Sequence, residues 1–152
     1  MNAAAVSGAQ ADSNSAGPKT RRLAFSGTTT GLRAGLPRVI IVPGLFDSGV
    51  AHWQTLWGRA HPEYRRVQQR DWNKPDLDAW SAVIDGELNE DRTPAILVAH
   101  SFGCLAAVVS AVRNPGRVAA ALLVAPANPA RFGIEHALHV AQLPFTSVLV
   151  AS

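Results

Sequence analysis

Short apolar runs alternate along the chain with segments whose apolar residues recur at helical spacing. The runs are rich in Val, Ile, Leu and Ala and nearly free of polar residues, which is typical of strands buried on both faces of a parallel sheet. They predict strands at residues 39–42, 95–99, 118–124 and 147–150, with a weaker, Arg-rich candidate at 64–69.

Helices are predicted between these strands. The segment at 50–60 carries Trp53, Leu56 and Trp57 on one face. A second helix follows Asp76, which suits the N-cap position. Its buried face is predicted to hold Leu77, Trp80, Ile84 and Leu88. An Ala- and Val-rich helix is predicted at 102–112, and a weak helical pattern covers 131–141.

This alternation predicts an α/β domain with a mainly parallel sheet and helices on both faces, joined by right-handed crossovers. We place the domain at residues 37–152. Residues 1–36 are rich in Ala, Ser, Gly and Thr and are expected to form a disordered extension, although a transit peptide is conceivable. Ligand sites in such sheets lie at the carboxyl ends of the strands, so the segments after residues 42, 71, 99, 124 and 150 are the places to search.

Composition narrows the class of protein. The chain has 152 residues, of which 47% are hydrophobic and 16% charged, enough apolar material for one core. No apolar run approaches the roughly 20 residues that a membrane span needs. Cys104 is the single cysteine, so an internal disulfide is impossible and a reducing compartment such as the cytoplasm is expected.

The basic charge is concentrated in the N-terminal segment. Residues 1–36 hold the whole net charge of +3, whereas the remainder balances its basic and acidic residues. The predicted domain therefore lacks the basic field that binding of a polyanion requires, which disfavours a nucleic-acid partner.

The segment after the predicted strand at 95–99 carries the chemistry. It reads Ala99-His100-Ser101-Phe102-Gly103, close to the G-x-S-x-G nucleophile elbow, with Ala99 in place of the first glycine. Such a turn is tight, so the residues two positions away on each side must be small. It would expose the Ser101 hydroxyl above the sheet. The alternative is that Ser101 only caps the following helix.

An oxyanion hole needs two N–H donors. The Phe102 N–H would lie at the helix N-terminus, and a second donor normally comes from the loop after an earlier strand. Gly44 lets that loop approach the elbow, and the Leu45 N–H is the candidate donor, with Phe46 next. The alternative is an ordinary turn between strand and helix.

Several spaced motifs together resemble a known family. They read VPGLFDS at 42–48, HWQ at 52–54, DW at 71–72, AHSFGC at 99–104 and LLVAPA at 122–127. Residues 38–152 are similar to the small single-domain serine hydrolases of the α/β-hydrolase fold, the family of YdeN and retinoblastoma-binding protein nine. The resemblance implies that Ser101 is the nucleophile and that the substrates are small esters or amides. We expect no cofactor and no metal.

A hydroxyl needs a base to become a good nucleophile, and the chain order in this fold is Ser, acid, His. After Ser101 the only carboxylate is Glu135 and the only histidines are His136 and His139. By the resemblance, the acid follows the strand that 147–150 matches, and the histidine comes later. We therefore expect the triad acid and base, with a final strand and helix, to be missing from a truncated and marginally stable chain.

Other polar residues near the predicted strand ends are weaker candidates for the active site. His52 could line the pocket or pack on its helix, and Asp71 suits a turn. The His100 side chain is expected to point away from the site, and Cys104 to be buried. A His136/His139 pair lacks a third metal ligand.

The sequence thus predicts a serine hydrolase with Ser101 as nucleophile and the Leu45 and Phe102 N–H groups as oxyanion donors. The competing interpretation is a non-catalytic remnant of the fold, or a binding module that keeps the pocket without the triad. The sequence names no protein partner.

Overall fold

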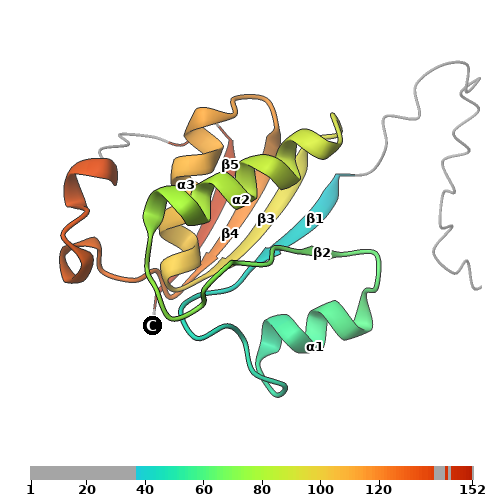
Figure 1. Ribbon diagram of the computed structural model, residues 1–152. Helices are drawn as coiled ribbons and strands as arrows, with labels where there is room; N and C mark the ends of the chain where they lie inside the picture. Colours follow the sequence, from blue (N-terminus) through green and yellow to red (C-terminus); the bar gives the residue numbers. More distant parts are fainter. Residues whose placement is uncertain (1–36, 139–142, 144, 152) are drawn as a thin grey trace, which may run out of the picture. The chain divides into compact units, whose positions relative to one another are not determined.

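The computed structural model describes residues 37–138, 143 and 145–151. In this part five parallel strands form one sheet in the order β2-β1-β3-β4-β5 (Figure 1). The strands are β1 (Arg38–Val42), β2 (Arg65–Arg66), β3 (Ala95–His100), β4 (Val118–Val124) and β5 (Thr146–Val150). The predicted α/β fold with a mainly parallel sheet is confirmed.

The strand order reverses direction between β1 and β3. The chain runs from β1 outward to β2 and then returns past β1 to β3, so the connections leave the two central strands toward opposite faces of the sheet. Loops diverge at such a switch point and leave a crevice at the carboxyl ends of the strands, where ligands bind in open α/β sheets. The segments after Val42 and His100 meet at this position.

The helices cover both faces of the sheet. Helices α2 (Leu77–Glu90) and α3 (Phe102–Arg113) lie side by side on one face, where they bury Ile40, Val42 and Leu97 (Figure 1). Helix α1 (Trp53–Ala60) contacts the opposite face, with Gly58 close to the Ile41 side chain. Alternate residues of β1 therefore face different helices, as the side-chain period of a strand requires.

Helix α2 forms where its sequence signals place it. The Asp76 carboxylate caps its start by accepting a hydrogen bond from the Ala79 N–H at 3.0 Å. Its predicted inner face is buried, comprising Leu77, Trp80, Ile84 and Leu88. At its other end the Arg38 guanidinium donates to the carbonyls of Glu87, Leu88 and Asp91, which have no partner within the helix.

Helix α1 differs from its prediction. It begins at Trp53 rather than residue 50, and its apolar face is not its buried face. Leu56 is 50% exposed and Trp57 is 43% exposed, whereas the only buried residue of the helix is Gln54. The cause is a polar contact, because the Gln54 side chain points toward the sheet and hydrogen-bonds to its backbone. The apolar side chains on the other side of the helix are therefore left partly exposed.

Two other predicted elements are shorter than expected. The Arg-rich candidate at 64–69 pairs as a strand only at Arg65 and Arg66. In place of the helical pattern at 131–141 stand two short 3-10 helices, η1 (Pro129–Phe132) and η2 (Glu135–Leu138), and residues 139–141 lie outside the described residues. Gly133, with φ of 64°, separates the two turns and prevents one continuous helix.

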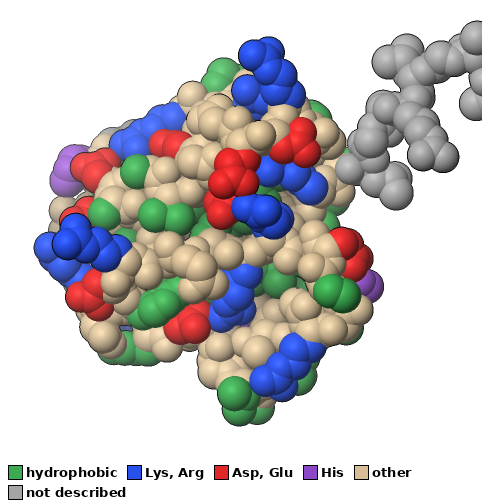
Figure 2. Space-filling view, turned by 45° about the vertical axis from the view of Figure 1, so that its right-hand side comes forward, with side chains coloured by type: hydrophobic (Ala, Val, Ile, Leu, Met, Phe, Trp, Pro, Cys, Tyr) green, Lys and Arg blue, Asp and Glu red, His purple; other side chains and the backbone are tan. Residues whose placement is uncertain are grey.

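Strand β5 is exposed along its whole length. Val148, Leu149 and Val150 are 54%, 66% and 44% exposed, which is unusual for three consecutive apolar residues. On the face shown in Figure 2, basic and acidic side chains are interspersed and do not gather in a field of one sign.

Candidate active site

Ser101 occupies the sharp turn between β3 and α3. Its backbone has φ of 52° and ψ of −125°, a region that residues other than glycine rarely adopt. Its N–H still donates to the Val124 carbonyl at 3.1 Å, so the strand pairing continues up to the turn. The side chain is partly exposed and makes no capping hydrogen bond to the helix. The structure therefore does not support the capping interpretation, and it keeps the hydroxyl available.

Gly44, in the loop after β1, lies directly against Ser101. A β-carbon at position 44 would be 2.7 Å from the Ser101 β-carbon and 3.4 Å from its Oγ. Contacts this short do not occur between real side chains, so only glycine fits here. The predicted approach of this loop to Ser101 is therefore present.

Gly103 permits a second close approach. A β-carbon there would be 2.2 Å from the Pro43 carbonyl oxygen and 2.8 Å from that of Val42. The first turn of α3 thus rests on the backbone at the end of β1. This contact brings the loop after β1 and the start of α3 to the same point.

The predicted backbone donors lie on these two segments. Within the described part of the chain, no hydrogen bond uses the N–H of Leu45 or that of Phe102. Phe46, the second choice in the loop, instead donates its N–H to the Trp72 carbonyl at 2.9 Å. The Phe102 side chain is fully buried and packs edge-on against Trp80 and Phe132, which anchors the start of α3.

The loop after β1 is itself strained. Phe46 and Asp47 both have positive φ angles, of 63° and 62°. Such conformations persist only where several contacts hold them. The Phe46 N–H bond to Trp72 is one contact, the Asp47 N–H bond to the Gly44 carbonyl at 3.2 Å is another, and the Arg66–Asp47 ion pair is a third.

Two histidines lie beside the turn on the α1 side. The rings of His52 and His100 have centroids 4.7 Å apart, and Trp53 packs against both. Burial and the neighbouring His52 lower the pKa of His100. Burial, followed by the Arg66 charge, lowers the pKa of His52 against a smaller opposing effect of Asp47. His52 Nδ1 also caps α1 by accepting from the Gln54 N–H, a bond that requires this nitrogen to be unprotonated.

Gln54 has a role that the sequence analysis missed. Its side chain is fully buried and binds three groups: its Nε2 donates to the carbonyls of Val42 at 3.1 Å and Val98 at 3.0 Å, and its Oε1 accepts from Ser48 Oγ at 2.8 Å. The available signal was the HWQ motif at 52–54, of which Gln54 is the last residue. Its meaning depends on pairing between β1 and β3, which helix periodicity does not encode.

The remaining sequence candidates lie in other surroundings. Cys104 is buried, its thiol donates weakly to the Val124 carbonyl, and burial raises its pKa to about 12, so it stays protonated. The Asp71 carboxylate forms a turn by accepting from the Asn73 N–H. Glu135 and His136 are exposed on η2, and His139 lies outside the described residues. Among the described residues no side chain hydrogen-bonds to Ser101 Oγ, and no three potential metal ligands gather.

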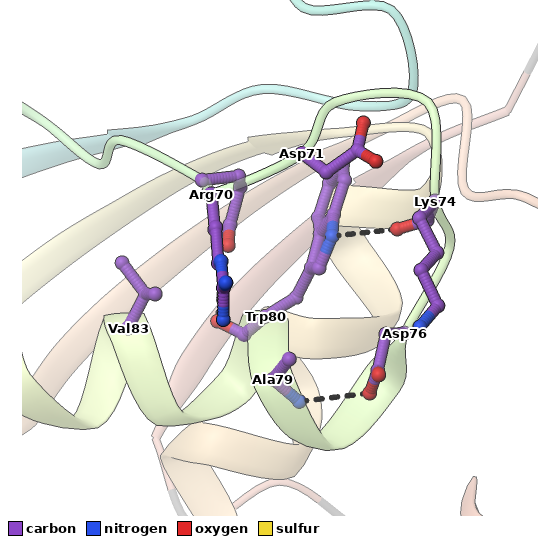
Figure 3. Close-up of a pocket in the computed structure, with 8 residues that line it drawn as sticks. Arg70, Asp71, Lys74, Asp76, Ala79, Trp80 and Val83 are labelled. Atoms are coloured by element: carbon purple, nitrogen blue, oxygen red, sulfur yellow. Dashed lines mark hydrogen bonds between the residues drawn. The ribbon is translucent and has the colours of Figure 1, made fainter.

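A pocket of about 530 Å³ lies apart from these residues, between the loop at 69–76 and α2 (Figure 3). Arg70, Asp71, Lys74 and Asp76 line it, and neither Ser101 nor Leu45 does. Its two carboxylates are engaged in the Asn73 turn and the α2 cap. Trp80 lines the pocket and packs edge-on against Phe102, which follows Ser101. We favour the turn at Ser101 over this pocket as the candidate site, because the switch point of the sheet and the strained backbone meet there.

The parallel sheet, the turn at the end of β3 and the loop after β1 define a domain of the α/β-hydrolase class. Residues 39–152 match the family model described as serine hydrolase, and the chain belongs to this family.

A crystal structure described as that of a YdeN-like hydrolase from Pectobacterium atrosepticum is similar, with a TM-score of 0.70 and 39% sequence identity. The match covers 74% of this chain and 60% of that protein, so the chain spans three-fifths of this relative's length. A comparison with curated proteins gave no match. In the part of the chain that the structure describes, no helix combines the length and apolar character needed to span a bilayer.

Proposed function

We propose that this protein is a serine hydrolase for small ester or amide substrates, with Ser101 as the nucleophile. The observation that carries the proposal is the backbone of Ser101, a non-glycine residue held at φ of 52° and ψ of −125° with Gly44 pressed against it. Strain of this kind persists where function requires it. Membership of the serine hydrolase family supports the same reaction class.

The chemistry follows from the two segments that meet at the turn. Ser101 Oγ would attack the substrate carbonyl carbon, and the carbonyl oxygen would take up the negative charge. The N–H groups of Leu45 and Phe102 would donate to this oxygen. Collapse of the intermediate would expel the alcohol or amine with a proton and leave an acyl-serine ester, which water then hydrolyses to the acid and the free hydroxyl.

We assign no triad acid or base to this chain. Glu135 is the only carboxylate after Ser101, and both it and His136 are exposed on η2. Acylation would then rely on oxyanion binding and on solvent hydroxide, which supplies weak catalysis. Its rate should rise about tenfold per pH unit between pH 7 and pH 9. A plateau near neutral pH would instead reveal a base in the protein.

A fluorophosphonate probe tests the nucleophile. The probe would form a bond from Ser101 Oγ to phosphorus and release fluoride together with the hydroxyl proton. We expect labelling of the full chain, and loss of labelling in Ser101→Ala. Ser110→Ala is the matched control, because Ser110 is a buried serine of α3 that bonds to Asp85. A folded wild type that takes no label would favour the binding-module alternative.

We also propose a reducing compartment such as the cytoplasm, a small-molecule substrate, and no nucleic-acid or membrane partner. The single cysteine and the balanced charge of residues 37–152 support this assignment.

A further inference from the structure

We propose that Gln54 is a positioning residue that holds the Leu45 N–H in place relative to Ser101. This inference rests on the proposed function, because it assigns a role in the same oxyanion site. Gln54 lies on α1 and is fully buried, so its amide has left water and must satisfy its hydrogen bonds within the protein.

The three hydrogen bonds of the Gln54 amide fix its orientation. Both bonds to strand carbonyls need a donor, so the amide nitrogen faces Val42 and Val98, and the amide oxygen faces Ser48 Oγ. One side chain therefore joins the end of β1, strand β3 and the loop after β1. Strand β1 leads to Leu45 and strand β3 leads to Ser101. Ser48 lies in the loop after β1, three residues beyond Leu45.

The end of β1 is also in contact with the first turn of α3. The Val42 carbonyl oxygen that Gln54 binds also lies near Gly103, where a β-carbon would be 2.8 Å from it. The end of β1 is thus fixed between the Gln54 amide and the first turn of α3. Since Gly44 follows Val42 by two residues and touches Ser101, a small shift of this strand end moves the loop against the nucleophile.

The loop after β1, which carries the Leu45 N–H, is strained. Phe46 and Asp47 hold positive φ angles, so the loop would relax if its anchors were removed. Gln54 anchors it through Ser48, whose carbonyl also accepts from Thr55 Oγ1 of the same helix at 2.8 Å. Helix α1 therefore holds the loop by two neighbouring side chains, and relaxation of the loop would displace the Leu45 N–H.

The test compares Gln54→Met with Gln69→Met. Gln69 is a second buried glutamine, 8% exposed, which donates to the Trp80 carbonyl and is not part of the proposed site. Both variants lose a buried amide of the same size. The measurement is labelling of the full chain by a fluorophosphonate over a range of probe concentrations, at a temperature where circular dichroism shows each variant folded.

We expect Gln54→Met to lower the maximal labelling rate about tenfold or more, the scale of a misplaced oxyanion donor, with the half-saturating probe concentration changed less than about twofold. Gln69→Met should keep the wild-type rate. Ser48→Ala removes one of the three Gln54 bonds and should give a smaller loss, which keeps the test valid if Gln54→Met does not fold.

Labelling of Gln54→Met and Ser48→Ala at the wild-type maximal rate would overturn the inference and leave Ser101 as the nucleophile. An equal loss in Gln69→Met would also overturn it, because the effect would then come from general destabilisation. Absence of labelling in the wild type would overturn the proposed function itself, and the role of Gln54 with it.

Discussion

Gly44 and Ser101 are separated by less space than a methyl group needs: a β-carbon on Gly44 would lie 2.7 Å from the β-carbon of Ser101. The two residues follow different strands, β1 and β3, which pair in parallel at the switch point of the sheet. Their contact brings together, at the Ser101 turn, the two segments that carry the candidate oxyanion donors Leu45 and Phe102.

Gly44→Ala should therefore damage the site more than the fold. The added methyl group must push the loop away from Ser101, which displaces the Leu45 donor and should reduce fluorophosphonate labelling about a hundredfold. Gly49→Ala is the control in the same loop, because a β-carbon there meets nothing within 4 Å. Equal labelling rates in the two variants would show that the loop after β1 does not take part in the reaction.

Gly103→Ala should act on stability. Its methyl group would overlap the Pro43 carbonyl oxygen, which is backbone at the end of β1 and cannot move without displacing the strand. We expect a loss of about 3 kcal/mol or more in the free energy of unfolding, measured with urea. Gly86→Ala, on the exposed side of α2 where a β-carbon meets nothing, should instead stabilise by about 0.5–1 kcal/mol.

The backbone strain at Ser101 predicts that a glycine at this position stabilises the fold, although the hydroxyl needed for the proposed reaction is then lost. Ser101→Gly should be more stable than Ser101→Ala by about 1–2 kcal/mol, because glycine adopts φ of 52° and ψ of −125° without penalty and alanine does not. Both variants remove the hydroxyl, so neither should accept the probe. The comparison needs only melting curves, and equal melting temperatures would show that the turn carries no strain.

The sequence predicted the elements that depend on local pattern. Apolar runs located β1, β3, β4 and β5, and the cap residue Asp76 located the start of α2. For these elements the deciding interaction is local in sequence, or is burial in a parallel sheet, which leaves a continuous apolar run. A small residue at position 103 was also predicted, from the tightness of the turn, but the contacts that require it are with the distant backbone of Val42 and Pro43.

The sequence did not predict the role of Gln54, and it misassigned the buried face of α1. The three bonds of Gln54 reach residues 6, 12 and 44 positions away, and they exist only once β1 and β3 pair. Helical periodicity ranks Trp53, Leu56 and Trp57 as the inner face because it weighs apolar area alone. A satisfied buried amide outweighs that preference here, since its three hydrogen bonds are made away from water and offset the exposure of part of a tryptophan.

The pH dependence of stability follows from the two histidines beside Ser101. The pKa of His100 is lowered by burial and by His52, and that of His52 by burial and by Arg66, so both release protons more readily in the folded chain than at the ordinary value of 6.5. The unfolded chain then binds more protons below pH 6.5, and stability must fall as pH drops through this range, while it stays constant above it with respect to these groups. Protonation of His52 Nδ1 would also remove the cap of α1.

We expect the melting temperature to fall between pH 7.5 and pH 5.5, and to fall less in His100→Gln. The control is His136→Gln, which alters an exposed histidine of η2 and should leave the wild-type fall unchanged; a fall in His100→Gln as large as in the wild type would contradict the assignment.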